Sequence, residues 1–185
     1  MHLSKPEIGV STLHRLSETF NKIIKQITNM NVKSIEIVDD GFHALSKKRV
    51  LTLRELGKSY GLKFSIHAPF ADINIASPSQ CMLKAMLKRL EKSITLANIL
   101  EAHVWVFHPG LKTGISMFYP GADWIQNCKT ARLLYSIAEE HNVKIAIENV
   151  PEPYPFLMKS VEHFKRFYKD IDVDLGIALD IGCLL

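Results

Sequence analysis

Short apolar segments alternate with helix-forming segments along this chain, and this alternation constrains its fold more than any other feature. Six short segments of β-branched or apolar residues predict strands, at residues 7–12, 34–38, 63–68, 103–108, 144–149 and 175–180. Between them, apolar residues recur every three or four positions, which is the pattern of a helix with one buried face. Strands that alternate with helices are typical of parallel β-α-β units. The sequence therefore predicts an α/β fold with about six parallel strands.

Two architectures are built from such units, an open doubly wound sheet and a (β/α)8 barrel. No glycine-rich phosphate loop follows the first predicted strand, which argues against a dinucleotide-binding sheet. The chain has 185 residues and contains no linker or low-complexity tract, and one domain per ~100–200 residues is usual. We therefore expect a single domain over residues 1–185.

Charge and composition exclude several classes of protein. Lys and Arg number 23 and Asp and Glu number 19, so the formal net charge is +4. Such mild basicity permits an anionic ligand, whereas nucleic-acid binders usually cluster their positive charge. No apolar run approaches the ~20 residues that cross a bilayer, and Cys81, Cys128 and Cys183 form no CxxC pair. We expect a cytoplasmic protein with no membrane partner.

Polar residues stand at the ends of four consecutive predicted strands. His67, His108, Glu148 and Asp180 each follow an apolar segment. In a parallel barrel these ends meet at one mouth, where the active sites of such barrels lie. Two imidazoles and two carboxylates match the ligand set of a divalent metal such as Zn²⁺ or Mn²⁺. One such residue alone would indicate a structural hydrogen bond, but four on successive strands predict a metal or catalytic centre.

Several short motifs resemble those of the xylose-isomerase-like TIM barrels. They are Ser-Ile-His-Ala-Pro-Phe (65–70), Asn-Ile-Ala-Ser (74–77), Phe-His-Pro-Gly (107–110), Ile-Glu-Asn (147–149) and Leu-Asp-Ile-Gly (179–182). That group contains sugar and sugar-phosphate isomerases and epimerases, and also the endonuclease IV family of abasic-site nucleases. The resemblance implies an incomplete (β/α)8 TIM barrel. Such a barrel usually needs ~250 residues, so we expect its last two β/α units to be absent.

The resemblance also implies roles for the strand-end residues. In the endonuclease IV family, the positions of His67, His108 and Glu148 form the first zinc site, and Asp180 would bind a second metal. In the isomerases, Glu148 and Asp180 match two ligands of a single divalent metal, and the histidines lie near the substrate. Glu148 and His108 are our candidate catalytic residues. The metal would polarise sugar oxygens or activate water against a phosphodiester.

Other residues near the predicted mouth are candidates for substrate binding. The second strand carries Glu36 and ends at Asp39 and Asp40, whose carboxylates we expect to face the mouth. Acidic groups repel the phosphates of DNA, so these residues favour a sugar over a nucleic acid. Four further candidates lie in loops, namely Asn74, Phe118, Tyr119 and Tyr154.

The third predicted helix has a clear start signal and a basic face. Ser77, Pro78 and Gln80 fit a capping box. Its basic residues are expected on a solvated face; they are Lys84, Lys88, Arg89 and Lys92.

Three functions remain open at this point. The first is a divalent-metal-dependent isomerase or epimerase acting on a small sugar or sugar phosphate. The second is a zinc-dependent abasic-site DNA endonuclease. The third is a non-catalytic barrel fragment that retains metal ligands. Because a six-stranded barrel wall leaves two strand edges unpaired, we also expect self-association.

Overall fold

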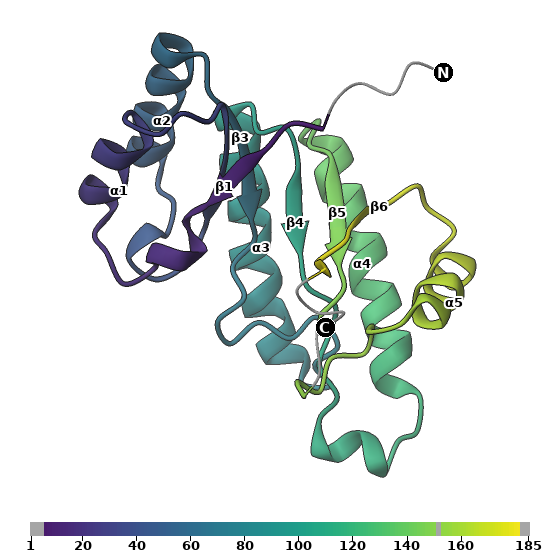
Figure 1. The fold of residues 1–185 in the computed structure, drawn as a ribbon. Helices are drawn as coiled ribbons and strands as arrows, with labels where there is room; N and C mark the ends of the chain where they lie inside the picture. Colours follow the sequence, from purple (N-terminus) through teal and green to yellow (C-terminus); the bar gives the residue numbers. More distant parts are fainter. Residues whose placement is uncertain (1–5, 151–152, 182–185) are drawn as a thin grey trace.

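The computed structural model of the protein describes residues 6–150 and 153–181, and its fold is shown in Figure 1. All six expected strands are confirmed, each within its predicted range. The strands are β1 (Gly9–Ser11), β2 (Ser34–Val38), β3 (Lys63–His67), β4 (Trp105–Phe107), β5 (Ile145–Glu148) and β6 (Gly176–Ala178). The α-helices of the described residues are α1 (Phe20–Ile27), α2 (Lys47–Tyr60), α3 (Gln80–Leu100), α4 (Ala122–Glu140) and α5 (Val161–Ile171).

The order of the strands decides between the two architectures. The sheet runs β1-β2-β3-β4-β5-β6, and every neighbouring pair is parallel. A doubly wound sheet instead reverses its strand order at a switch point. Strictly sequential parallel strands, with α3 and α4 running behind β3 to β5 (Figure 1), form the wall of a TIM barrel. The described strands make up six of the eight that such a barrel contains.

The two faces of the sheet differ in character. One face packs beneath the helices, and its buried residues are Ile35, Ile37, Phe64, Ile66, Trp105, Phe107, Ile145 and Ile147. Side chains alternate between faces along a strand. The intervening residues, among them Glu36, Ser65, His67 and Glu148, therefore point to the inside of the barrel wall. The polar strand-end residues are thus held by a rigid, apolar layer behind them.

The start of α3 differs from its prediction. Ser79, not Ser77, is the N-cap, and the helix begins at Gln80. Ser77 instead belongs to a local turn, since its amide donates to Asn74 O at 3.0 Å and its hydroxyl accepts from Ser79 N at 3.3 Å. Ser79 makes no side-chain capping hydrogen bond, so the predicted capping box of Ser77 and Gln80 is wrong.

The edge strand β6 and its continuation carry apolar side chains on the face toward the helices. Ile177, Leu179 and Ile181 are 57%, 67% and 69% exposed. In the described residues β6 pairs with β5 alone. An apolar strand edge of this kind is a site where another polypeptide segment can add.

None of the described helices combines the length and the apolar composition that a bilayer crossing requires.

Candidate metal centre

Three of the four predicted strand-end ligands converge at the carboxyl end of the sheet. His67 ends β3, His108 follows β4 directly, and Glu148 ends β5. His67 Nε2 lies 3.1 Å from His108 Nε2 and 3.4 Å from Glu148 Oε2, and His108 Nε2 lies 3.3 Å from the same oxygen. Among the described residues, these three side chains bring their donor atoms within 4.8 Å of one another, close enough to hold a metal ion together.

The spacing of the three donor atoms fits a metal. Ligands ~2.0–2.2 Å from a tetrahedral Zn²⁺ stand ~3.3 Å from one another, which is close to the separations observed here. His67 Nδ1 lies 2.8 Å from Ala68 O. Because a carbonyl only accepts, Nδ1 carries the hydrogen and the neutral ring directs a lone pair from Nε2 toward the other two donors. Metal-binding histidines are commonly oriented by such an outer hydrogen bond.

The electrostatics of the group also suit a cation. Burial raises the pKa of Glu148, but hydrogen bonds from His108 and His67 outweigh burial and bring it to about 2. Burial lowers the pKa of His67, but its hydrogen bonds to Glu148 and to Ala68 O raise it on balance above its usual value. The carboxylate is therefore ionised at neutral pH, and the space between the three groups favours either a proton or a metal cation.

Aromatic rings enclose the two histidines. The Phe70 ring lies edge-on to His67 at 5.4 Å between centroids and 5.9 Å from His108. The Phe156 ring, from the loop after β5, lies edge-on to His108 at 5.4 Å between centroids. Apolar walls of this kind limit the access of water and strengthen the electrostatic interactions between the polar groups.

The loop after β4 is anchored directly beside His108. Gly110 N donates to Oδ1 of the buried Asn127 on α4 at 2.7 Å, and Gly110 O accepts from Leu157 N at 2.9 Å. Asn74 joins this loop to the loop after β3. Its Oδ1 accepts from Ala76 N at 3.0 Å and Leu111 N at 2.8 Å, and its Nδ2 donates to Leu111 O at 3.1 Å. Main-chain groups thus engage the Asn74 amide and give it a structural role, and its role in substrate binding stays a prediction.

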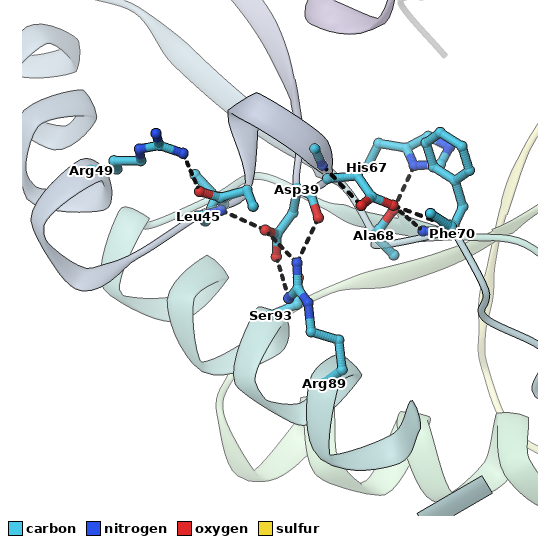
Figure 2. A network of polar contacts seen from close by, with 12 residues as sticks. Asp39, Leu45, Arg49, His67, Ala68, Phe70, Arg89 and Ser93 are labelled. Atoms are coloured by element: carbon cyan, nitrogen blue, oxygen red, sulfur yellow. Dashed lines mark hydrogen bonds and ion pairs between the residues drawn. The ribbon is translucent and has the colours of Figure 1, made fainter. Parts of the chain in front are cut away.

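The acidic end of β2 does not face the mouth as predicted. Asp39 is fully buried and pairs with Arg89 of α3, with Arg89 Nη2 2.8 Å from Asp39 Oδ1 (Figure 2). Asp40 accepts hydrogen bonds from Gly41 N, Phe70 N and Ala71 N. Both carboxylates hold loops, so they give no support for a sugar over DNA. Arg89, expected on a solvated face, is instead drawn inward by the buried charge.

The remaining predicted site residues lie outside this group of three. Asp180 follows β6, where its main-chain N and O bond to the Asn149 side chain at 2.8 and 3.0 Å. Its carboxylate is not part of the metal-binding group, and its role as a ligand stays a prediction. Glu36 lies on the inner face and contributes to raising the pKa of His67. Three loop aromatics are exposed on the surface; they are Phe118 at 77%, Tyr119 at 62% and Tyr154 at 58%.

Sequence comparison assigns the family. A family profile described as the xylose isomerase-like TIM barrel matches residues 24–184. The chain belongs to this family. Two proteins of Methanocaldococcus jannaschii, MJ1311 and MJ1614, both described as uncharacterized, are similar to this xylose isomerase-like chain. They are 34% identical over 177 residues and 30% identical over 180 residues. Each match covers 95% of this chain but only 60% and 67% of the relative.

Solved structures agree with this assignment. A D-tagatose 3-epimerase-like protein shares 33% identity and a TM-score of 0.89, over 97% of this xylose isomerase-like chain and 66% of that one. D-psicose 3-epimerase from Clostridium cellulolyticum H10 has a TM-score of 0.78 over 95% of this chain and 63% of that one. At 17% identity the second likeness shows the shared fold alone. The expected incomplete TIM barrel is confirmed.

Proposed function

We propose that this chain is a divalent-metal-dependent isomerase or epimerase that acts on a small sugar or sugar phosphate. The observation that carries the proposal is the convergence of His67 Nε2, His108 Nε2 and Glu148 Oε2 within 3.1–3.4 Å of one another. The similarity to a D-tagatose 3-epimerase-like protein supports the sugar chemistry. A divalent cation, Zn²⁺ or Mn²⁺, would polarise the hydroxyl and carbonyl oxygens of the sugar.

The three residues differ in what they can do. His67 is the most enclosed, with its side chain 8% exposed, and its Nδ1 is committed to Ala68 O, so its role is to hold the cation. His108 and Glu148 are 23% and 20% exposed and reach the mouth. We assign these two residues, besides holding the cation, the transfer of a proton at the carbon next to the sugar carbonyl. Return of that proton to the neighbouring carbon gives isomerisation, and return to the other face of the same carbon gives epimerisation.

Further contacts to the sugar are proposed for the inner wall and the mouth. Glu36 lies on the inner face near His67, where its carboxylate can accept hydrogen bonds from sugar hydroxyls. Tyr154 stands 6.4 Å, between ring centroids, from Phe156, which itself packs on His108. Aromatic rings beside the cation offer flat surfaces for a sugar ring. Asp180 is proposed as an additional metal ligand from β6.

The test is turnover of a panel of ketoses and aldoses, free and phosphorylated, in deuterium oxide with Zn²⁺ or Mn²⁺. The proposal predicts incorporation of deuterium at a carbon next to the carbonyl, lost in Glu148→Gln and retained in Glu140→Gln, which changes an exposed residue of α4. Cleavage of a duplex with an abasic site, without sugar turnover, would favour the endonuclease alternative. Metal binding without either activity would identify this chain as a non-catalytic barrel fragment.

Two broader expectations accompany the proposal. Self-association through the apolar edge at Ile177, Leu179 and Ile181 predicts a sedimentation coefficient that rises with protein concentration. A cytoplasmic location would place the protein where sugar phosphates are available.

A further inference from the structure

We propose that Arg89 is a positioning residue for the metal centre, and that it acts through Asp39 on the end of β3 that carries His67. The inference rests on the metal centre proposed above. The hydrogen bonds and ion pair of Arg89 go to Asp39 and to none of the three donor residues, and the helical pattern predicted a solvated face for it. Its position is nevertheless defined by three hydrogen bonds to one buried residue.

The guanidinium of Arg89 binds Asp39 on three atoms. Nη1 donates to Oδ2 at 3.0 Å, and Nη2 donates to Oδ1 at 2.8 Å and to the main-chain O at 2.7 Å. The Asp39 side chain is fully buried and that of Arg89 is 31% exposed. A planar guanidinium can satisfy both carboxylate oxygens at once, and the geometry of such a fork is specific. Arg89 therefore fixes both the charge and the orientation of Asp39.

Asp39 transmits this orientation to β3. Its main-chain N donates to His67 O at 2.9 Å, and its Oδ1 also accepts from Leu45 N at 2.6 Å. Figure 2 shows Arg89 reaching from α3 to Asp39, and His67 lying beyond it. The main-chain N and O and both carboxylate oxygens of Asp39 are thus engaged. A change in its position would move the carbonyl of His67 with it.

The next residue fixes the other end of the same segment. Asp40 Oδ2 accepts from Phe70 N at 3.0 Å and from Ala71 N at 2.8 Å. Residues 67–71 are therefore tied to the end of β2 at both ends. This segment contains Ala68 O, which orients the His67 ring, and the Phe70 ring, which packs against it. The direction of His67 Nε2 thus depends on the Arg89–Asp39 pair.

The experiment compares metal affinity and stability in matched variants. Arg89→Lys keeps the charge but loses the fork. Arg89→Met combined with Asp39→Asn removes the unpaired buried charge that Arg89→Met alone would leave. The control is Arg54→Met, which removes an arginine that pairs with Glu101, away from the metal centre. Zn²⁺ affinity is measured by competition with a chelator, and the geometry of the site by the visible spectrum of the Co²⁺ form.

Loss of an outer partner typically weakens metal binding about 10–100-fold. We expect a loss in this range for Arg89→Lys and for the double variant, with an altered Co²⁺ spectrum, measured at a temperature at which both variants are folded. Zn²⁺ affinity and a Co²⁺ spectrum equal to those of the wild type in both Arg89 variants would overturn the inference.

A second measurement separates this inference from the proposed function. Hydrogen–deuterium exchange of residues 67–71 is followed in the metal-free protein. Faster exchange there in Arg89→Lys, but not in Arg54→Met, supports the positioning role even if the wild type binds no metal, in which case the proposed function alone fails. Unchanged exchange in this segment contradicts the positioning role.

Discussion

Gly110 and Ala76 approach so closely that no side chain fits between them. A β-carbon on Gly110 would lie 2.3 Å from Ala76 Cβ and 2.7 Å from Ala76 N. This contact joins the turn after His108 to the loop after β3, which follows His67 in the chain. The glycine of the His-Pro-Gly motif is therefore required by packing between the two loops that flank the metal centre.

Gly110→Ala is expected to destabilise the protein. The new methyl group must displace main-chain atoms, and such overpacking costs about 1–3 kcal/mol. Gly114→Ala, in the same loop, is the control, since no atom lies within 4 Å of its added carbon. Its effect should stay within about 0.5 kcal/mol. Urea unfolding measures both, and equal stabilities of the two variants would contradict the account.

Asn149→Ala is expected to loosen the end of β6. The Asn149 side chain binds both the main-chain N and the main-chain O of Asp180. Leaving these groups without their partner costs about 1–3 kcal/mol of stability. We expect this destabilisation to be confined to the sheet edge. Hydrogen–deuterium exchange should accelerate at residues 176–181 and stay unchanged in β2 and β3. Acceleration throughout the sheet would show that Asn149 supports the whole fold instead.

Cys128 is expected to resist thiol reagents that modify Cys81. Burial raises the pKa of the Cys128 thiol to about 11, so at pH 8 only about one molecule in a thousand carries the reactive thiolate. Cys81 is exposed, and Cys183 lies outside the described residues. Iodoacetamide at pH 8 followed by peptide mass spectrometry should label Cys81 first, and Cys128 only above pH 10 or after unfolding. Equal labelling of Cys81 and Cys128 in the folded protein at pH 8 would contradict its burial.

Local sequence patterns were sufficient to predict the strands and the convergence of His67, His108 and Glu148. Strand ends are marked by a change from apolar to polar residues, and a parallel barrel brings successive ends together. The family resemblance then selected the barrel over the doubly wound sheet, and the sequential strand order confirmed it. These features depend on residues that are adjacent in the chain or on one repeated unit.

The contacts behind the candidate site depend on residues far apart in the sequence and could not be predicted in this way. Arg89 and Asp39 are separated by 50 positions, and nothing local to either residue indicates the pair. One signal was available, because Arg89 stands three residues after Met86 and four before Ser93, both of which are buried on α3. That spacing places Arg89 at the margin of the buried face. The hydrogen bonds of Asn74 could not be predicted for the same reason, since its partner Leu111 lies on another loop.

The most direct test of the central claim is the metal content of the purified chain. Protein prepared without chelators or affinity metals is analysed by elemental mass spectrometry, before and after reconstitution with Zn²⁺ or Mn²⁺. The account predicts about one bound divalent ion per chain, as expected for a single group of three donors. The bound ion should be removed by EDTA and should be absent from a folded Glu148→Gln variant. A folded wild-type chain that binds no divalent metal after reconstitution would contradict the assignment of His67, His108 and Glu148 as a metal centre.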